Sequence, residues 1–149
     1  YRSFVAGHYS LSWVIFFNYH IFIKTLNLNM SSKISLMSRI LLGLILFVFG
    51  INKFFGFIPT PPPDDFMQAL INTGYMWELI GFTEVSSGLL LLTNKWKGLA
   101  LIFASIISVN IVFYRLILDP TAFEVALLTA SLNVLLIYFN WSSFKTLFK

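Results

Sequence analysis

The chain has 149 residues and a net charge of +4; 58% of its residues are hydrophobic, 11% are charged, and none is cysteine. A soluble globular domain carries about 25% charged residues, so this composition excludes a water-soluble fold, and the mean hydropathy of +0.82 indicates an integral membrane protein. The lack of cysteine excludes disulfides, thiolate metal sites and dithiol redox chemistry.

The first 29 residues differ from the rest of the sequence. Their apolar run, residues 11–23, is interrupted by Asn18 and His20 and is too short for a bilayer core of about 30 Å. Met30 then precedes a longer apolar run. We therefore interpret residues 1–29 as a leader, either non-native sequence or a segment that lies in the membrane interface. Both histidines fall in this leader, so no histidine-based metal site is expected in residues 30–149.

Four apolar segments follow, and each approaches the length of about 20 helical residues that a bilayer core requires. Proline, asparagine and aspartate separate them, as is typical of loops. The sequence therefore predicts an all-α fold, an integral membrane bundle of four helices. The predicted spans lie near residues 36–57, 75–93, 98–118 and 122–141.

The charged residues outside these segments predict the orientation of the chain. Basic residues flank three of the aqueous segments: Lys33, Arg39, Lys95, Lys97, Lys145 and Lys149. The other two linkers carry aspartates: Asp64, Asp65 and Asp119. Because basic residues favour the cytoplasmic side, we expect both termini inside, in a multi-pass protein of the cell (inner or cytoplasmic) membrane. The positive charge is explained by this topology, so the bilayer is the expected partner and nucleic acid is not.

Glu84 is the most deeply placed ionisable residue. It lies nine residues after Tyr75, which at 1.5 Å per residue is about 13 Å along the span, near the middle of a core of about 30 Å. Gly81 and Gly88 flank it at offsets that put all three on one helix face. Glycines allow a neighbouring helix to approach closely. We therefore expect this face to pack against protein.

Several polar residues of the other spans are candidates to meet Glu84: Asn52, Lys53, Asn110, Arg115, Glu124 and Asn133. One interpretation is an interhelical polar network that fixes the packing of the bundle. The other is an outward-open polar pocket that binds a small molecule or relays a proton. Lys53, Arg115 and Glu124 are shallow enough to reach lipid headgroups, which favours the first interpretation for them. Antiparallel neighbouring spans also place Lys53 in the same outer half as Glu84, which predicts an ion pair. No residue is assigned a catalytic role or a metal.

Short motifs in the first three spans resemble those of DoxX-like small membrane proteins. These motifs are RILLG at 39–43, FGINKFFGF at 49–57, TGYM at 73–76, TEV at 83–85 and DP at 119–120. The resemblance covers residues 30–149 and excludes the leader. Arg115 departs from the pattern, because many members have histidine or leucine there.

The resemblance implies a four-helix membrane bundle linked to redox biology, because DoxD relatives are subunits of a thiosulfate:quinone oxidoreductase. The lysine and glutamate of the family correspond to Lys53 and Glu84. We therefore expect an accessory or structural subunit of a quinone-linked membrane complex that touches quinone through Glu84, with other subunits or further copies as partners. A stand-alone enzyme is not favoured. The alternative function is a small permease or proton-coupled carrier that acts as an oligomer.

Overall fold

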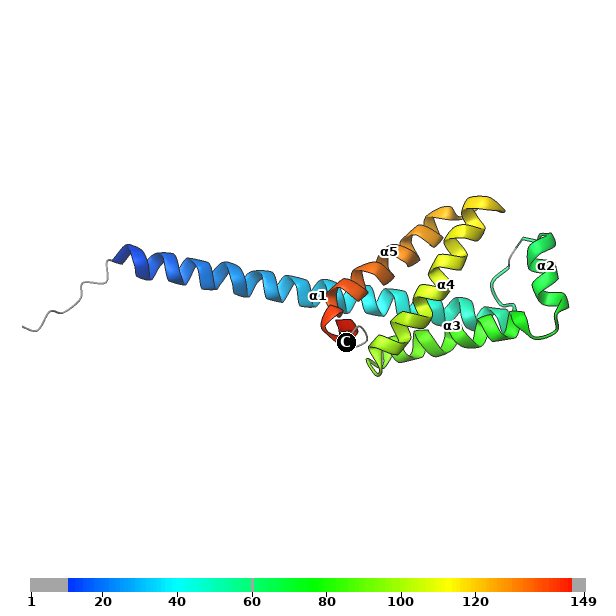
Figure 1. The fold of residues 1–149 in the computed structure, drawn as a ribbon, viewed down its shortest axis with the longest axis horizontal. Coiled ribbons are helices and arrows are strands. Elements are labelled where there is room, and N and C mark those ends of the chain that lie inside the picture. Colours follow the sequence, from blue (N-terminus) through cyan, green and yellow to red (C-terminus); the bar gives the residue numbers. More distant parts are fainter. Residues whose placement is uncertain (1–10, 60, 146–149) are drawn as a thin grey trace, which may run out of the picture. The chain divides into compact units, whose positions relative to one another are not determined.

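The computed structural model describes residues 11–59 and 61–145, with the backbone alone for residues 11–20 and 22–29 (Figure 1). The chain divides into two units, residues 1–34 and 35–149. Every element in the described residues is a helix, so the all-α class is confirmed. The helices are α1 Leu11–Phe55, α2 Asp65–Asn72, α3 Met76–Leu92, α4 Lys97–Ile117, α5 Phe123–Phe139 and α6 Trp141–Phe144.

Helix α1 contains the first predicted span, and its end is determined by two residues. The N–H of Gly56, which has φ +60°, donates to the carbonyl oxygen of Asn52 at 2.8 Å. Glycine is favoured in this left-handed conformation after a helix. The side chain of Asn52 also accepts from the N–H of Ile58 at 2.6 Å. The helix therefore ends at Phe55, two residues before the predicted boundary.

The start of α1 differs more from the prediction. The helix begins at Leu11, so residues 11–29 are helical and Met30 lies within the same helix. Residues 1–10 lie outside the described residues. That residues 1–29 form a leader stays a prediction.

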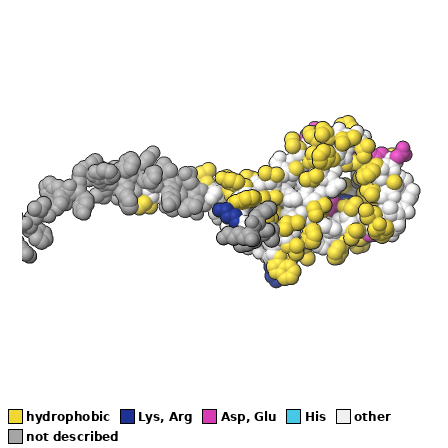
Figure 2. All heavy atoms as spheres, viewed as in Figure 1, with side chains coloured by type: hydrophobic (Ala, Val, Ile, Leu, Met, Phe, Trp, Pro, Cys, Tyr) yellow, Lys and Arg dark blue, Asp and Glu magenta, His cyan; other side chains and the backbone are white. Residues whose placement is uncertain are grey.

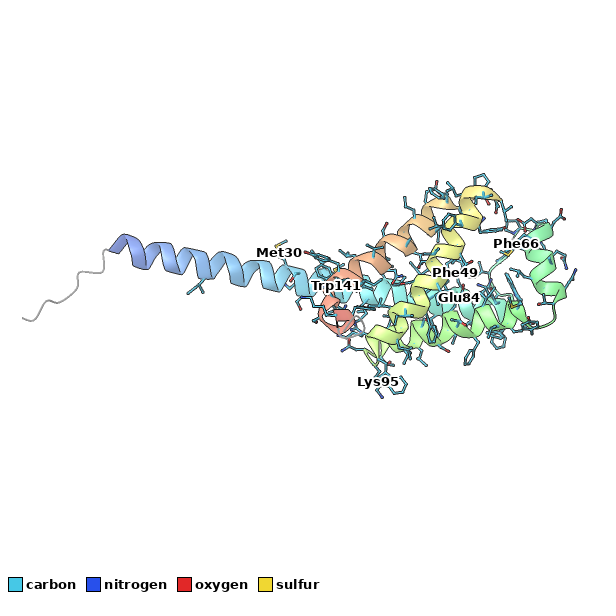
Figure 3. The ribbon with its side chains drawn as sticks, viewed as in Figure 1. Met30, Phe49, Phe66, Glu84, Lys95 and Trp141 are labelled. Atoms are coloured by element: carbon cyan, nitrogen blue, oxygen red, sulfur yellow. The ribbon has the colours of Figure 1, made fainter. Side chains whose placement is uncertain are left out.

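Helix α2 was not predicted and interrupts the linker between the first two spans. Its N-cap is Asp64, whose carboxylate accepts from the N–H of Met67 at 2.8 Å. The same carboxylate accepts from the hydroxyl of Tyr114 in α4 at 2.9 Å. The ring of Phe66, labelled in Figure 3, lies 5.9 Å from the ring of Tyr114, measured between centroids. These contacts dock α2 against the C-terminal end of α4.

Glycines bring the C-terminal part of α1 and α3 together as antiparallel neighbours (Figure 1). Gly43 lies opposite Gly88, and Gly50 lies opposite Gly81. A Cβ atom added to Gly88 would lie 2.6 Å from the backbone nitrogen of Phe47, so no larger residue fits without a shift. Close backbone approach at small residues is the usual packing of membrane helices.

The core of the second unit lies where α4 packs against α3 and α5, and Leu42 and Leu46 of α1 belong to the same cluster. Small residues on α4, Ala100 and Ala104, are fully buried and let its neighbours approach. Larger buried side chains fill the remaining space: Leu42, Leu46, Leu91, Leu101, Ile107, Leu136 and Phe144. At the cytoplasm-facing end of the predicted topology, the Arg39 guanidinium donates to the carbonyl oxygens of Leu91 and Leu92, which caps α3.

The helices have the lengths and surfaces of membrane helices. Among the described residues, Met30–Phe55 and Lys97–Ile117 are long and apolar enough to span a bilayer. Helices α3 and α5 have 17 residues each, or about 26 Å at 1.5 Å per residue, which is the lower end of spanning length. Helices α3, α4 and α5 begin and end within two residues of the predicted spans. Large apolar side chains cover much of the face seen in Figure 2, and many are exposed.

Candidate functional site

An ion pair joins α1 and α3 at the glycine contact. The Nζ of Lys53 lies 2.5 Å from Oε2 of Glu84. The Glu84 side chain is 3% exposed and that of Lys53 is 14% exposed. Both charges are therefore largely removed from solvent. An unpaired charge in such a buried position would be costly. Glu84 is labelled in Figure 3.

The glycine register positions the two charged residues. A Cβ atom on Gly50 would lie 2.9 Å from Cβ of Glu84, and one on Gly81 would lie 3.2 Å from Cβ of Lys53. The backbones of α1 and α3 are thus close enough for the two side chains to meet across the contact. Gly81 and Glu84 are one turn apart on the face of α3 that packs against α1.

Trp77 adds a third member that the sequence analysis missed. The Lys53 ammonium lies 5.2 Å from the centroid of the Trp77 ring, within the range of a cation–π interaction. Trp77 precedes Gly81 by four residues and Glu84 by seven, so it lies on the same face of α3. This spacing in the sequence could have predicted that Trp77 lies beside the Lys53–Glu84 pair.

In the described residues, no hydrogen bond or ion pair joins the other four predicted site residues to Lys53 or Glu84. Asn52 bonds the backbone of Ile58 at the end of α1. Asn110 is exposed on α4 and donates to the carbonyl oxygen of Ile106 in its own helix. Glu124 is exposed in the first turn of α5. These side chains lie at helix ends or on an outward face, and a polar pocket formed by the predicted residues stays a prediction.

Arg115 pairs with Asp119, four residues later in the chain. Asp119 also accepts from the hydroxyl of Thr121 at 2.6 Å and from the N–H of Thr121 at 3.0 Å. The hydroxyl bond, followed by the N–H bond and the Arg115 cation, holds the pKa of Asp119 below its ordinary value of 3.8. This cluster organises the turn between α4 and α5.

A second polar contact lies between α4 and α5. Asn133, which the sequence offered as a partner for Glu84, instead donates from Nδ2 to Oγ of Ser105 at 2.9 Å. In the described residues, no group of three His, Cys, Asp or Glu side chains is placed to hold a metal ion. The Lys53–Glu84 pair and the Asn133–Ser105 bond therefore offer charge pairing and hydrogen bonding between helices.

Residues 34–115 match the DoxX family. This range is more than half of the chain and includes the Lys53–Glu84 pair and the glycines around it. The chain belongs to the DoxX family. The resemblance stated from the motifs is thus confirmed, and with helices of spanning length this DoxX chain is a membrane protein. No curated protein and no solved structure is significantly similar to it.

Proposed function

We propose that this DoxX protein is an accessory, structural subunit of a membrane redox complex, with four spans and both termini in the cytoplasm. The link to redox biology comes from the family. The structural role is supported by the Lys53–Glu84 pair, in which the two charges satisfy each other. Because Lys53 engages the Glu84 carboxylate, that carboxylate is not free to bind a quinone.

The proposed spans are the C-terminal part of α1 and helices α3, α4 and α5. Helix lengths from about 26 Å upward at 1.5 Å per residue support a crossing by each. The basic residues Lys95 and Lys97 lie at the α3–α4 turn, and Asp119 lies at the α4–α5 turn, as the rule of cytoplasmic positive charge requires.

The natural absence of cysteine allows a direct topology test in intact cells. Asn94 and Thr121 are both exposed, at the two opposite turns of α4. We expect Thr121→Cys to react with a membrane-impermeant maleimide and Asn94→Cys to react only after the membrane is permeabilised. Labelling of Asn94→Cys alone in intact cells would show the opposite orientation. Labelling of both variants would contradict the proposal that α4 spans the membrane.

The observation that carries the subunit role is the position of Asn110. It is exposed on α4, seven residues before the end of the helix at Ile117, or about 10 Å into the span at 1.5 Å per residue. Its Nδ2 bonds Ile106, and no described residue donates to its Oδ1. An amide facing acyl chains is unfavourable, whereas interhelical hydrogen bonds commonly join membrane helices. We infer that another subunit contacts Asn110.

Co-purification in mild detergent tests this role. We expect the wild-type chain to be recovered with subunits of a redox complex, identified by mass spectrometry, and Asn110→Leu to lose them. Gln68→Leu is the matched control, because it replaces another exposed amide, on α2, whose bond is to Asn72. Recovery of the wild-type chain without partners, or equal recovery with Asn110→Leu, would contradict the proposal.

The carrier alternative has less support. A carrier needs a polar path, and the charges of Lys53 and Glu84 pair with each other. Proteoliposome flux that depends on Glu84 would revive this alternative, whereas flux indifferent to Glu84→Gln would count against it.

A further inference from the structure

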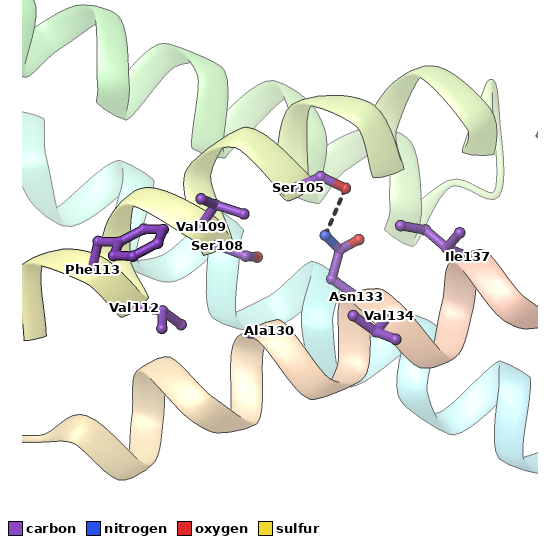
Figure 4. Close-up of a pocket in the computed structure, with 9 residues that line it drawn as sticks. All are labelled: Ser105, Ser108, Val109, Val112, Phe113, Ala130, Asn133, Val134 and Ile137. Atoms are coloured by element: carbon purple, nitrogen blue, oxygen red, sulfur yellow. Dashed lines mark hydrogen bonds between the residues drawn. The ribbon is translucent and has the colours of Figure 1, made fainter. Parts of the chain in front are cut away.

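A groove of about 280 Å³ lies between α4 and α5, away from the Lys53–Glu84 pair (Figure 4). Its wall is mostly apolar, with valine, isoleucine, phenylalanine and alanine side chains. Three polar side chains also line it: Ser105, Ser108 and Asn133. A mostly apolar cavity with a few convergent polar groups is the usual form of a small-molecule site.

Two buried polar atoms on residues that line this groove have no hydrogen-bond partner. They are Oγ of Ser108 and Oδ1 of Asn133, on residues that are 2% and 3% exposed. Buried polar side-chain atoms in native proteins are nearly always bonded. In Figure 4 both side chains extend into the space between α4 and α5. A ligand that meets both atoms would complete the polar bonding of the groove.

The surrounding bonds fix which atom of Asn133 is unpaired. The Ser105 hydroxyl donates its proton to the carbonyl oxygen of Leu101 at 2.7 Å, so its oxygen must accept from Asn133. Asn133 therefore presents its Nδ2 to Ser105 at 2.9 Å and leaves the acceptor Oδ1 for the groove. The Ser108 hydroxyl can both donate and accept.

The groove lies at the middle of α4 and opens sideways. Ser108 lies eleven residues after Lys97, or about 16 Å along a helix of about 31 Å at 1.5 Å per residue. The rim residues Val109 and Val134 are 54% and 66% exposed. In a bilayer this opening faces acyl chains, so an occupant arrives from the membrane.

We propose that the groove binds an uncharged amphiphile through a hydroxyl group, which donates to Oδ1 of Asn133 and accepts from the Ser108 hydroxyl. One hydroxyl has the donor and the acceptor that the two atoms need. No ionisable side chain lines the groove, so a charged headgroup has no counterpart there. The volume is just below the usual range of about 300–1,000 Å³ for ligand pockets. It therefore suits the polar head or a single ring of the amphiphile. A shallower depression along α5, which shares Ala130 and Val134 and reaches Tyr138, leaves room for the tail.

The test compares hydroxyl ligands with their methyl ethers on the full-length protein in detergent micelles. Para-hexylphenol and para-hexylanisole form one pair, and n-octanol and its methyl ether form the other. Binding is measured from the ligand-concentration dependence of the unfolding temperature, since a ligand of the folded state stabilises it by mass action. We expect at least one hydroxyl compound to bind more tightly than its ether. The pair that shows the difference tells whether the bound hydroxyl belongs to a phenol or to an aliphatic alcohol.

Matched variants locate the binding. Ser108→Ala should weaken hydroxyl binding about tenfold, the effect of one lost hydrogen bond that leaves its partner unsatisfied, and should raise the unfolding temperature of the ligand-free protein. Ala130→Leu should fill the groove and abolish binding. Ser87→Ala is the control, because Ser87 is a buried serine of α3 that bonds its own helix at Thr83. Equal binding of hydroxyl and ether compounds, or unchanged binding in Ser108→Ala, would overturn the proposal.

Discussion

Replacement of Lys53 alone should destabilise the protein more than replacement of Lys53 and Glu84 together. Lys53→Met removes the cation that lies 2.5 Å from Oε2 of Glu84 and leaves a carboxyl group that is 3% exposed. Removal of one member of a buried ion pair costs about 3–5 kcal/mol. With Glu84→Gln as well, the remaining group is a neutral amide, and an unsatisfied neutral group costs about 1–3 kcal/mol. The double variant should therefore lose less stability than the sum of the two single variants, with a coupling free energy in the range of about 0.5–3 kcal/mol that contacting residues show.

The assay is a double-mutant cycle on reversible unfolding of the purified protein in mixed micelles. The Arg115–Asp119 pair is the matched control in the same chain, because it is more exposed, at 24% and 28%, and its members are four residues apart on one segment. The cycle of Arg115→Met with Asp119→Asn should give a smaller coupling free energy, because solvent screens exposed charges. Additive losses at Lys53 and Glu84 would refute the reasoning, because they would mean that the two groups do not interact energetically.

Three further changes test the packing and the loops. Gly88→Ala should cost about 1–3 kcal/mol, because its Cβ would lie 2.6 Å from a backbone nitrogen of α1, whereas Gly98→Ala meets open space and should be neutral or stabilising; equal effects in unfolding experiments would contradict the glycine contact. Tyr114→Phe removes the bond to Asp64, so amide hydrogen exchange should accelerate in α2 and stay unchanged in α3; uniform acceleration would contradict local docking. The pKa of Asp119 is lowered on folding, so its contribution to stability is complete above its unfolded pKa of 3.8 and is lost as pH falls through the folded pKa. The stability difference between wild type and Asp119→Asn should therefore shrink in acid, and a difference that grows would contradict the assignment.

Much of the fold follows from the sequence. Composition indicates a membrane protein, and the apolar runs predict α3, α4 and α5 to within two residues at each end, because helix length is set by bilayer thickness. The spacing of Gly81, Glu84 and Gly88 predicts one packed face. The sequence also places Lys53 in the same outer half as Glu84, and their charged atoms are in contact in the structure.

What the sequence by itself determined is the location of the apolar helices along the chain and the family, while the tertiary structure decided which way each helix faces. Helices α3 and α5 have no distinct apolar stripe, and lipid is as apolar as a protein core, so hydrophobic periodicity does not mark the inner face. Only packing shows that Asn133 turns inward to Ser105 while Asn110 turns outward. The same is true of Arg39, whose contact with the end of α3 depends on the close approach that Gly43 and Gly88 permit.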